Sequence, residues 1–432
     1  MAKLVIIGAG SGFGGRLSID FLSREPLRDG AVIGLCDIDR GRLEKVAAYV
    51  RRTVEAHGLA AEVVAATDAG ELLDGADFVV TSVAVGGGAY WGYPFAHEIN
   101  IPGKYGVDQS VADTVGPGGV FRFLRTAPVQ LQFCKDVERH CPDALLLNHT
   151  NPMAMLTWLH SLGSSVRNVG LCHSVQGTTK QLAGYIGAPY DQISYWVAGI
   201  NHQAWVLAFR HKGVDAYGRL REAMADPEVF AKDPVRFEMM RHFDFFVTES
   251  SHHNSEYLPY FRQTQDVRDR FGLKSRTVPM DPPRKRAWMA ESGVGEEPPV
   301  GELKRSHEFT TGIMEAVVTD TPYRFNGNVM NDGLVTNLPA GCCVEVPCVA
   351  DRQGVHPCYV GDLPAQLAAI NRSNVAVQQL AVEAFFRKNR QAAFQAVALD
   401  PLTAGVLPLH RIREMFDEMW EAEKDLLAYF DE

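Results

Sequence analysis

Residues 3–15 read KLVIIGAGSGFGG and decide the fold. The short apolar run 3–7 is typical of a strand buried in a parallel sheet. Glycines directly after such a strand allow a tight turn and let backbone N–H groups approach a pyrophosphate at the start of the next helix. Residues 16–24 have helical periodicity. The stretch therefore predicts a strand, a glycine turn and a helix that together bind a dinucleotide.

The spacing of the glycines leaves the register of this motif open. Counted from Gly8, the fingerprint places Phe13 where its third glycine belongs. Counted from Gly10, the pattern is complete through Gly12 and Gly15, but the turn begins two residues late. A glycine-rich turn that binds nothing is the alternative. The residues expected to contact the dinucleotide are Gly8, Gly10, Ser11, Gly12 and Phe13.

Further strands extend the pattern along the first half of the chain. The apolar run 31–36 ends in Asp37, whose carboxylate suits hydrogen bonding to a ribose and repels a 2′-phosphate, so NAD is favoured over NADP. Residues 76–82 and 145–148 are expected to be strands as well. Strands that alternate with helices predict a Rossmann-type, doubly wound parallel sheet, which we assign to residues 1–192.

Length, charge and cysteine pattern exclude several classes of protein. With 432 residues the chain is long enough for two domains, and its formal net charge of −10 argues against a nucleic-acid binder. No apolar run is long enough to cross a membrane, and no signal peptide is visible at the N-terminus. The eight cysteines are scattered without the spacing of a disulfide framework. We expect a cytoplasmic protein with neither nucleic-acid nor membrane partners.

The second half has a different pattern and predicts an α+β catalytic domain over residues 193–432. Residues 195–198 and 204–209 are expected to be paired strands, and another strand-rich piece covers 326–349. The tail from 364 to 430 is mostly amphipathic helix, interrupted near Asp400. Two segments are interpreted as loops. The glycine-rich residues 86–119 are expected to form an ordered active-site loop, and 276–308 are expected to form an excursion or lid.

Cys172 and His202 each lie in a short polar island within an apolar, strand-like stretch. A thiolate and an imidazole suit a divalent first-row transition metal, and two protein ligands leave positions open for a substrate. The alternative is a buried thiol and a core histidine.

Taken together, the motifs resemble family 4 of the glycoside hydrolases, the NAD-dependent exceptions to two-carboxylate hydrolysis. The resemblance covers essentially the whole chain. It rests on the turn 8–11, Asp37-Ile38-Asp39, the loop 113–119, Asn151-Pro152, Cys172 to Val175, Gly199 to His202 and Asn337-Leu338-Pro339. It implies a fold like that of lactate and malate dehydrogenases, and homodimers or homotetramers. The residues Cys-His-Ser-Val resemble the α-galactosidase subgroup, with α-glucosidases and α-uronidases differing little.

The same resemblance implies a mechanism. NAD⁺ accepts a hydride from the C3 carbon of the sugar, a base removes the acidified C2 proton, and the aglycone leaves C1 by elimination. Water then adds, and NADH returns the hydride. The metal, which the resemblance implies is Mn²⁺, with Co²⁺ or Ni²⁺ as the other options, binds the C2 and C3 oxygens as a Lewis acid. An NAD-dependent hydroxy-acid dehydrogenase would need no metal and would accumulate NADH. A silent NAD-binding sensor would have lost the metal ligands or the tyrosine.

Site roles follow from the resemblance residue by residue. It implies that Cys172 and His202 bind the metal and that Tyr257 is the base, although Tyr257 in an apolar cluster also suits packing. His173 is expected to protonate the leaving group or to bind a substrate hydroxyl. Asp113 is expected to assist acid–base chemistry or to order His173. The remaining candidates are Asn151 for substrate or nicotinamide, and Glu249, His252 and His253 for the sugar pocket, where a solvated polar turn is the alternative.

Overall fold

The N-terminal half forms the predicted parallel sheet. The computed structural model describes residues 1–86, 91–280 and 300–432. Six parallel strands lie in the order β3-β2-β1-β4-β5-β6, which is the doubly wound dinucleotide-binding order. They are β1 Lys3–Ile7, β2 Val32–Cys36, β3 Glu62–Ala66, β4 Phe78–Thr81, β5 Leu145–Asn148 and β6 Arg167–Gly170. The expected Rossmann-type fold class is confirmed.

Both faces of this sheet are buried, which explains its continuous apolar strands. In β1, Leu4 and Ile6 belong to one core, whereas Val5 and Ile7 belong to a second core on the other face. Side chains alternate across a strand, so a run of apolar residues requires cover on both sides. The covering helices are α1 Gly12–Leu22, α2 Glu25–Arg28, α3 Arg40–Ala56, α4 Gly70–Leu73, α6 Gly116–His140 and α7 Met153–Gly163. The next helix, α8 Ser174–Tyr185, belongs to a separate core of the second half.

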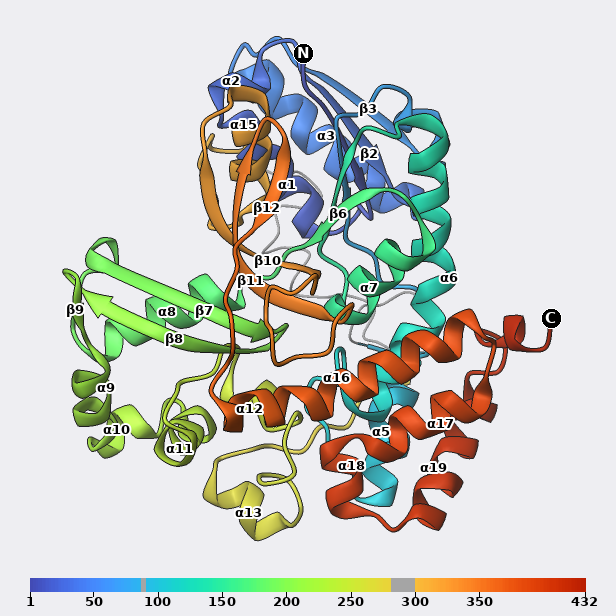
Figure 1. Ribbon diagram of the computed structural model, residues 1–432. Coiled ribbons are helices and arrows are strands. Elements are labelled where there is room, and N and C mark those ends of the chain that lie inside the picture. The colour runs from blue at the N-terminus through green and yellow to red at the C-terminus, as the bar shows by residue number, and fades with distance from the viewer. Residues whose placement is uncertain (87–90, 281–299) are drawn as a thin grey trace.

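Antiparallel strands continue the same sheet beyond β6 (Figure 1). A single residue pair, Asn328 with Gly170, joins β10 to β6. Beyond β10 the order is β11-β7-β8-β9, and β12 pairs with β11. These strands are β7 Ile193–Ile200, β8 Gln203–His211, β9 Val214–Asp215, β10 Tyr323–Met330, β11 Cys343–Asp351 and β12 Gly354–Pro357. The expected hairpin of residues 195–209 is present as β7 and β8.

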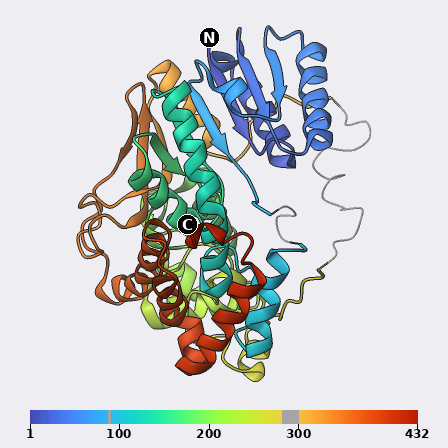
Figure 2. The same cartoon turned by 90° about the vertical axis from the view of Figure 1, so that its right-hand side faces the viewer.

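Helices complete the second half. Figure 2 shows the N-terminal layers at the top and the C-terminal helices below, with the long α6 running between them. The interruption expected near Asp400 is present, because its carboxylate accepts a hydrogen bond from the Thr403 N–H at 2.8 Å and caps α18. The helices are α9 Tyr217–Met224, α10 Pro227–Phe230, α11 Pro234–Phe243, α12 Ser251–Asn254, α13 Gln265–Arg270, α15 Thr310–Thr319, α16 Ala365–Phe386, α17 Arg390–Leu399, α18 Pro401–Val406 and α19 Leu409–Ala422.

The interpretation of residues 86–119 as one long loop is wrong. The segment contains an eleven-residue helix, α5 Phe95–Tyr105, and α6 begins within it at Gly116. Phe95 and Ile99 are buried on one face of α5 and pack with Val278, which stabilises the helix despite Pro102 in its interior. Proline and flanking glycines normally indicate a loop, and tertiary packing overrides that signal here. Residues 87–90, and 281–299 of the expected lid, lie outside the described residues.

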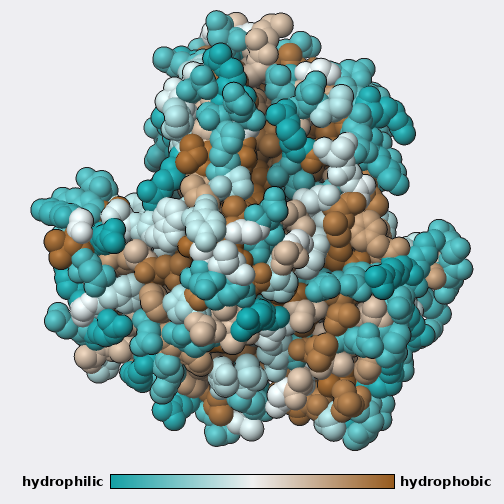
Figure 3. Space-filling view, in the orientation of Figure 1, coloured by the Kyte–Doolittle hydropathy of each residue, from teal (hydrophilic) through white to brown (hydrophobic). Residues whose placement is uncertain are grey.

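The described helices include none that is both long enough and apolar enough to span a bilayer. Figure 3 shows a surface that is mainly hydrophilic at its edges, with hydrophobic patches over the C-terminal helices. Leu399 at the end of α17 and Leu409 at the start of α19 have exposed fractions of 56% and 68%.

Candidate active site

At Gly8 in the turn after β1, and at Gly14 in the first turn of α1, neighbouring backbone atoms leave no room for a side chain. Gly8 has a φ of 91°, and a Cβ there would lie 2.1 Å from the Ser82 carbonyl oxygen. A Cβ on Gly14 would lie 2.4 Å from the Ala9 carbonyl oxygen, so α1 packs directly on the turn. Gly14 thus has the packing role that the fingerprint gives to its third glycine. These close approaches favour the register counted from Gly8, lengthened by one residue.

Asp37 lies beside this turn at the end of β2. One carboxylate oxygen accepts a hydrogen bond from the Gly10 N–H at 2.8 Å, and the other accepts one from the Asp39 N–H at 2.9 Å. A Cβ on Gly10 would lie 2.7 Å from this carboxylate. The cradle at the start of α1 therefore depends on glycine, and the residues present fit a dinucleotide with a free ribose hydroxyl.

Cys172 and His202 come together although they lie on different elements. Cys172 follows β6 and His202 lies in the turn between β7 and β8, yet Cys172 Sγ is 3.2 Å from His202 Nε2. Glu249 Oε2 lies 3.8 Å from the same nitrogen. Ligand atoms of these three residues all lie within 4.8 Å of one another. Sulfur, imidazole and carboxylate donors at this spacing fit a divalent transition metal.

A second group of buried residues adjoins this donor set. Asp113 Oδ1 lies 3.3 Å from His253 Nε2, and His253 Nδ1 lies 3.8 Å from Glu249 Oε1. The Asn151 amide donates to Asp113 Oδ2 at 2.9 Å. The rings of His202 and His253 lie 4.5 Å apart between their centroids. Four residues expected to act separately are thus linked in one cluster with His202.

Three residues of the site adopt left-handed backbone conformations that are costly for side chains other than glycine. His202 has a φ of 62°, Glu249 of 72°, and Ala112, which precedes Asp113, of 52°. Each such residue costs roughly 1–3 kcal/mol, and non-glycine examples concentrate at functional sites. The chain accepts this strain where the side chains of the cluster converge.

The charges of the cluster depend on one another. Burial raises the pKa of Glu249, but His202 and His253 outweigh it and hold that pKa at about 2. Burial, followed by the Glu345 and Glu249 carboxylates, raises the pKa of the Cys172 thiol to about 12. The bare thiol is therefore protonated at neutral pH, and a metal ion must displace this proton on binding.

Buried polar groups beneath the donor set have no protein partner among the described residues. Asn201 and Glu345 are fully buried, and neither makes a side-chain hydrogen bond there. Glu345 lies on β11, where it pairs with Asn328 of β10 on one side and with Gly199 of β7 on the other. Burial raises the pKa of Glu345 to about 8. Unsatisfied buried groups of this kind are consistent with a site completed by a cation and water.

His173 and Tyr257 occupy very different environments. The His173 side chain is 73% exposed, and its Nδ1 lies 3.6 Å from a Glu308 carboxylate oxygen. Tyr257 is fully buried, with its ring 5.7 Å from that of His253. Burial, with the charges of Asp113 and Glu249, raises the pKa of the Tyr257 phenol well above its usual value. A phenol in this state needs a compensating positive charge to act as a base.

Glu256 and Thr114 belong to the site but were not singled out from the sequence. The buried Glu256 carboxylate accepts hydrogen bonds from the backbone N–H groups of Val111 at 2.6 Å and Ala112 at 3.0 Å. It fixes the segment that carries Asp113, far away in the sequence. No local pattern reveals such a contact. His252 and His253 were equal candidates, and the structure separates them, because His252 is exposed while His253 is buried in the cluster.

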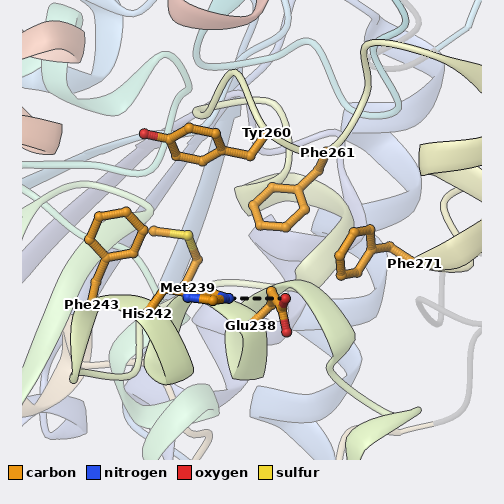
Figure 4. A pocket seen from close by; sticks show the side chains of 7 residues that line it. All are labelled: Glu238, Met239, His242, Phe243, Tyr260, Phe261 and Phe271. Carbon is orange, nitrogen blue, oxygen red and sulfur yellow. Dashed lines mark hydrogen bonds and ion pairs between the residues drawn. The ribbon is translucent and has the colours of Figure 1, made fainter.

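A separate pocket of about 400 Å³ lies elsewhere, between α11 and the segment 260–271 (Figure 4). Aromatic rings surround it, and the His242 imidazole is paired with the Glu238 carboxylate at 3.2 Å. None of the predicted site residues lines this pocket. Its lining residues are Glu238, Met239, His242, Phe243, Tyr260, Phe261 and Phe271.

Comparison with known proteins identifies the family. The model of the family 4 glycosyl hydrolases matches residues 3–188, and the model of their C-terminal domain matches residues 197–403. The chain therefore belongs to family 4 of the glycosyl hydrolases and is an enzyme of that family. The predicted family is confirmed.

Individual proteins agree with this assignment. An α-galactosidase of Bacillus subtilis (strain 168) is 39% identical over 440 residues, covering 100% of both chains. An α-galactosidase of Rhizobium meliloti (strain 1021) is 36% identical, covering 99% of this chain and 89% of the relative. A 6-phospho-β-glucosidase of Thermotoga maritima, solved with manganese, NAD⁺ and glucose-6-phosphate, has the same fold, with a TM-score of 0.79 and 20% identity over 98% of this chain and 99% of that one.

Proposed function

We propose that this enzyme hydrolyses α-galactosides with the help of NAD and a divalent metal, for which Mn²⁺ is our first choice. The two relatives that are 36–39% identical and named α-galactosidases support the choice of sugar. The carrying observation is the donor set of Cys172, His202 and Glu249, in the same molecule as a glycine cradle suited to a dinucleotide. When bound, NAD supplies a reversible hydride acceptor and the metal supplies a Lewis acid.

The protein residues divide the remaining work. Cys172 and His202 hold the metal, and Glu249 either completes its coordination or binds a sugar hydroxyl. Asp37 binds the adenosine ribose, and Gly8, Gly10, Ser11, Gly12 and Phe13 surround the dinucleotide. Asn151, held by Asp113 at 2.9 Å, is positioned for substrate or nicotinamide.

The two proton transfers are carried out by residues that differ in exposure to solvent. Buried Tyr257 takes the C2 proton, away from water. Exposed His173 protonates the leaving group, which must depart toward solvent. The Glu308 contact is the main cause of a raised His173 pKa of about 9, so the imidazole carries a proton to donate at neutral pH.

The proposal is tested by assaying p-nitrophenyl α-galactoside with and without NAD⁺, Mn²⁺ and a thiol reductant, beside the corresponding glucosides and uronides. We expect turnover of the galactoside only with both cofactors and no net NADH. Cys172→Ser is expected to abolish metal-dependent turnover while NAD⁺ binding persists. Cys358→Ser, at another partly buried cysteine, is the matched control and should remain active. Unchanged activity after chelation and NAD⁺ removal would exclude the mechanism.

We also propose that the enzyme works in the cytoplasm as a homodimer or homotetramer and that its domains divide at residues 192 and 193. None of the eight cysteines, all of which the structure describes, is in a disulfide, as suits a reducing compartment. The exposed Leu399 and Leu409 suit a subunit interface. Light scattering of the purified protein tests the oligomeric state.

A further inference from the structure

Thr114 lies between the metal-binding histidine and a buried carboxylate. Its side chain is buried, with an exposed fraction of 1% for the residue. The hydroxyl oxygen is 2.7 Å from Asp113 Oδ1 and 3.3 Å from His202 Nδ1. The other ring nitrogen, His202 Nε2, is the one that faces Cys172 Sγ at 3.2 Å and Glu249 Oε2 at 3.8 Å.

The direction of these two hydrogen bonds follows from proton counting. A threonine hydroxyl has one proton to donate, whereas an ionised carboxylate can only accept. The Asp113 carboxylate is surrounded by donors: Oδ2 accepts from the Asn151 amide at 2.9 Å, and Oδ1 faces the Thr114 hydroxyl at 2.7 Å and His253 Nε2 at 3.3 Å. Thr114 therefore donates to Asp113. Its oxygen can then only accept from His202, which requires the proton of the neutral imidazole to be on Nδ1.

We propose that Thr114 is a positioning residue that selects the Nδ1–H tautomer of His202 and so leaves the Nε2 lone pair free for the metal. This inference rests on the proposed metal-binding function of Cys172 and His202. The opposite tautomer would place a proton on Nε2, between the imidazole and the Cys172 sulfur, and would block coordination there. Metal-binding histidines commonly have their other nitrogen fixed in this way by a carboxylate or carbonyl. Here the Thr114 hydroxyl connects the His202 ring to the Asp113 carboxylate.

The backbone around Thr114 is held rigidly enough for this role. The Glu256 carboxylate binds the N–H groups of Val111 and Ala112 just before it. On its other side, the first turn of α6 packs against the Thr114 backbone, because a Cβ on Gly119 would lie 2.5 Å from the Thr114 carbonyl carbon. His202 itself has a strained φ of 62° in a two-residue turn. The hydroxyl therefore meets the ring from a fixed position.

The experiment compares Thr114→Val, which keeps the shape and removes the hydroxyl, with Thr114→Ser, which keeps the hydroxyl. Metal-free protein is titrated with Mn²⁺ by electron paramagnetic resonance and with Co²⁺ by the thiolate charge-transfer band. We expect Thr114→Val to weaken binding of both ions by about 10- to 100-fold, the usual effect of losing such a partner. Thr114→Ser should bind within a few-fold of the wild type. Thr53→Val removes a buried hydroxyl elsewhere and should leave binding unchanged.

A spectroscopic measurement reads the tautomer directly and separates positioning from folding. In ¹⁵N-histidine-labelled, metal-free protein, the His202 signals, assigned with His202→Gln, should show Nδ1 protonated in the wild type and a shift toward Nε2–H in Thr114→Val. An Nε2–H tautomer in the wild type, or Mn²⁺ binding by Thr114→Val equal to that of the wild type, overturns the inference. A wild-type protein that binds neither ion overturns the proposed metal site instead, and the nitrogen signals still decide the role of Thr114.

Discussion

Glu249 combines a left-handed backbone with a side chain directed at the donor set, so stability and activity conflict at this residue. Its φ of 72° is one that glycine adopts freely. We predict that Glu249→Gly will raise the free energy of unfolding by about 1 kcal/mol through relief of strain and lower kcat at least tenfold through loss of the carboxylate. Thermal and denaturant unfolding, together with galactoside turnover, check both parts.

Lys212 provides the matched control for this prediction. It has a φ of 52°, is exposed in the turn between β8 and β9, and contacts nothing in the cluster. Lys212→Gly should give a comparable stabilisation with unchanged turnover. If Glu249→Gly is instead destabilised while Lys212→Gly is stabilised, contacts of the Glu249 carboxylate outweigh the backbone strain, and the conflict at this residue does not exist.

At the residue scale, the structure brings together two candidate ligands whose signal in the sequence was local. Cys172 and His202 were conspicuous because each interrupts an apolar stretch, and their side chains lie 3.2 Å apart. Glu256 gave no such signal, because its importance comes from backbone N–H groups at residues 110–112. His252 and His253 were indistinguishable as neighbours in the sequence. Only the orientation of α12 buries one of them and exposes the other.

At the scale of elements, the junction between the glycine turn and α1 depends on Gly14. An added Cβ there would lie 2.4 Å from the Ala9 carbonyl oxygen and 2.7 Å from its Cα, both of them backbone atoms that cannot move cheaply. We predict that Gly14→Ala will displace α1 from the turn, lower the melting temperature and weaken NAD⁺ binding at least tenfold. Isothermal titration with NAD⁺ and thermal unfolding measure the two effects.

The neighbouring glycine tests the register of the motif. Gly15 is the third glycine if counting begins at Gly10, but its Cβ would lie 3.4 Å from the Tyr49 ring, close to ordinary contact. Gly15→Ala should therefore bind NAD⁺ nearly as well as the wild type. Should Gly15→Ala lose binding while Gly14→Ala retains it, the register counted from Gly10 would be the functional one.

Helix α16 holds two parts of the site together through its buried amides. The Asn374 amide donates to Gln203 Oε1 and to the Tyr257 carbonyl oxygen, both at 3.1 Å. Asn374→Leu would leave both acceptors buried without this donor. We predict a loss of about 1–3 kcal/mol in unfolding free energy and a lower kcat with little change in NAD⁺ affinity. Denaturant unfolding and steady-state kinetics check this. An unchanged kcat would show that Tyr257 does not depend on α16 for its position.

On the scale of the whole molecule, the two halves of the sheet differed in how well the sequence predicted them. The parallel half repeats a local unit of strand and helix, so its order followed from the pattern and was confirmed. The continuation of the sheet through β10 was not predicted. It depends on one pairing, Asn328 with Gly170, between segments far apart in the chain. Such a junction leaves no periodic signal, because it is set by packing; a Cβ on Gly170 would lie only 2.4 Å from the Thr157 hydroxyl.

The stability of the whole fold should depend on pH through His160, which is buried between α7 and α6. Its Nε2 lies 3.1 Å from Gln130 Oε1, and its Nδ1 has no hydrogen-bond partner among the described residues. Burial lowers the pKa of His160 to about 3. Because the folded pKa lies below the unfolded value of about 6.5, the contribution of His160 to stability is complete above pH 6.5. It is lost as the pH falls, since only the unfolded chain then takes up the proton.

We therefore predict that the unfolding free energy will fall by up to about 1.4 kcal/mol for each pH unit below 6.5 because of this one residue. Denaturant unfolding between pH 8 and pH 5 measures the slope. His160→Gln, which cannot titrate, will be less stable at pH 8 but should show a slope smaller by that amount. His410→Gln, at an exposed position, should keep the wild-type slope. Equal slopes for the wild type and His160→Gln would mean that His160 does not control the acid sensitivity of this fold.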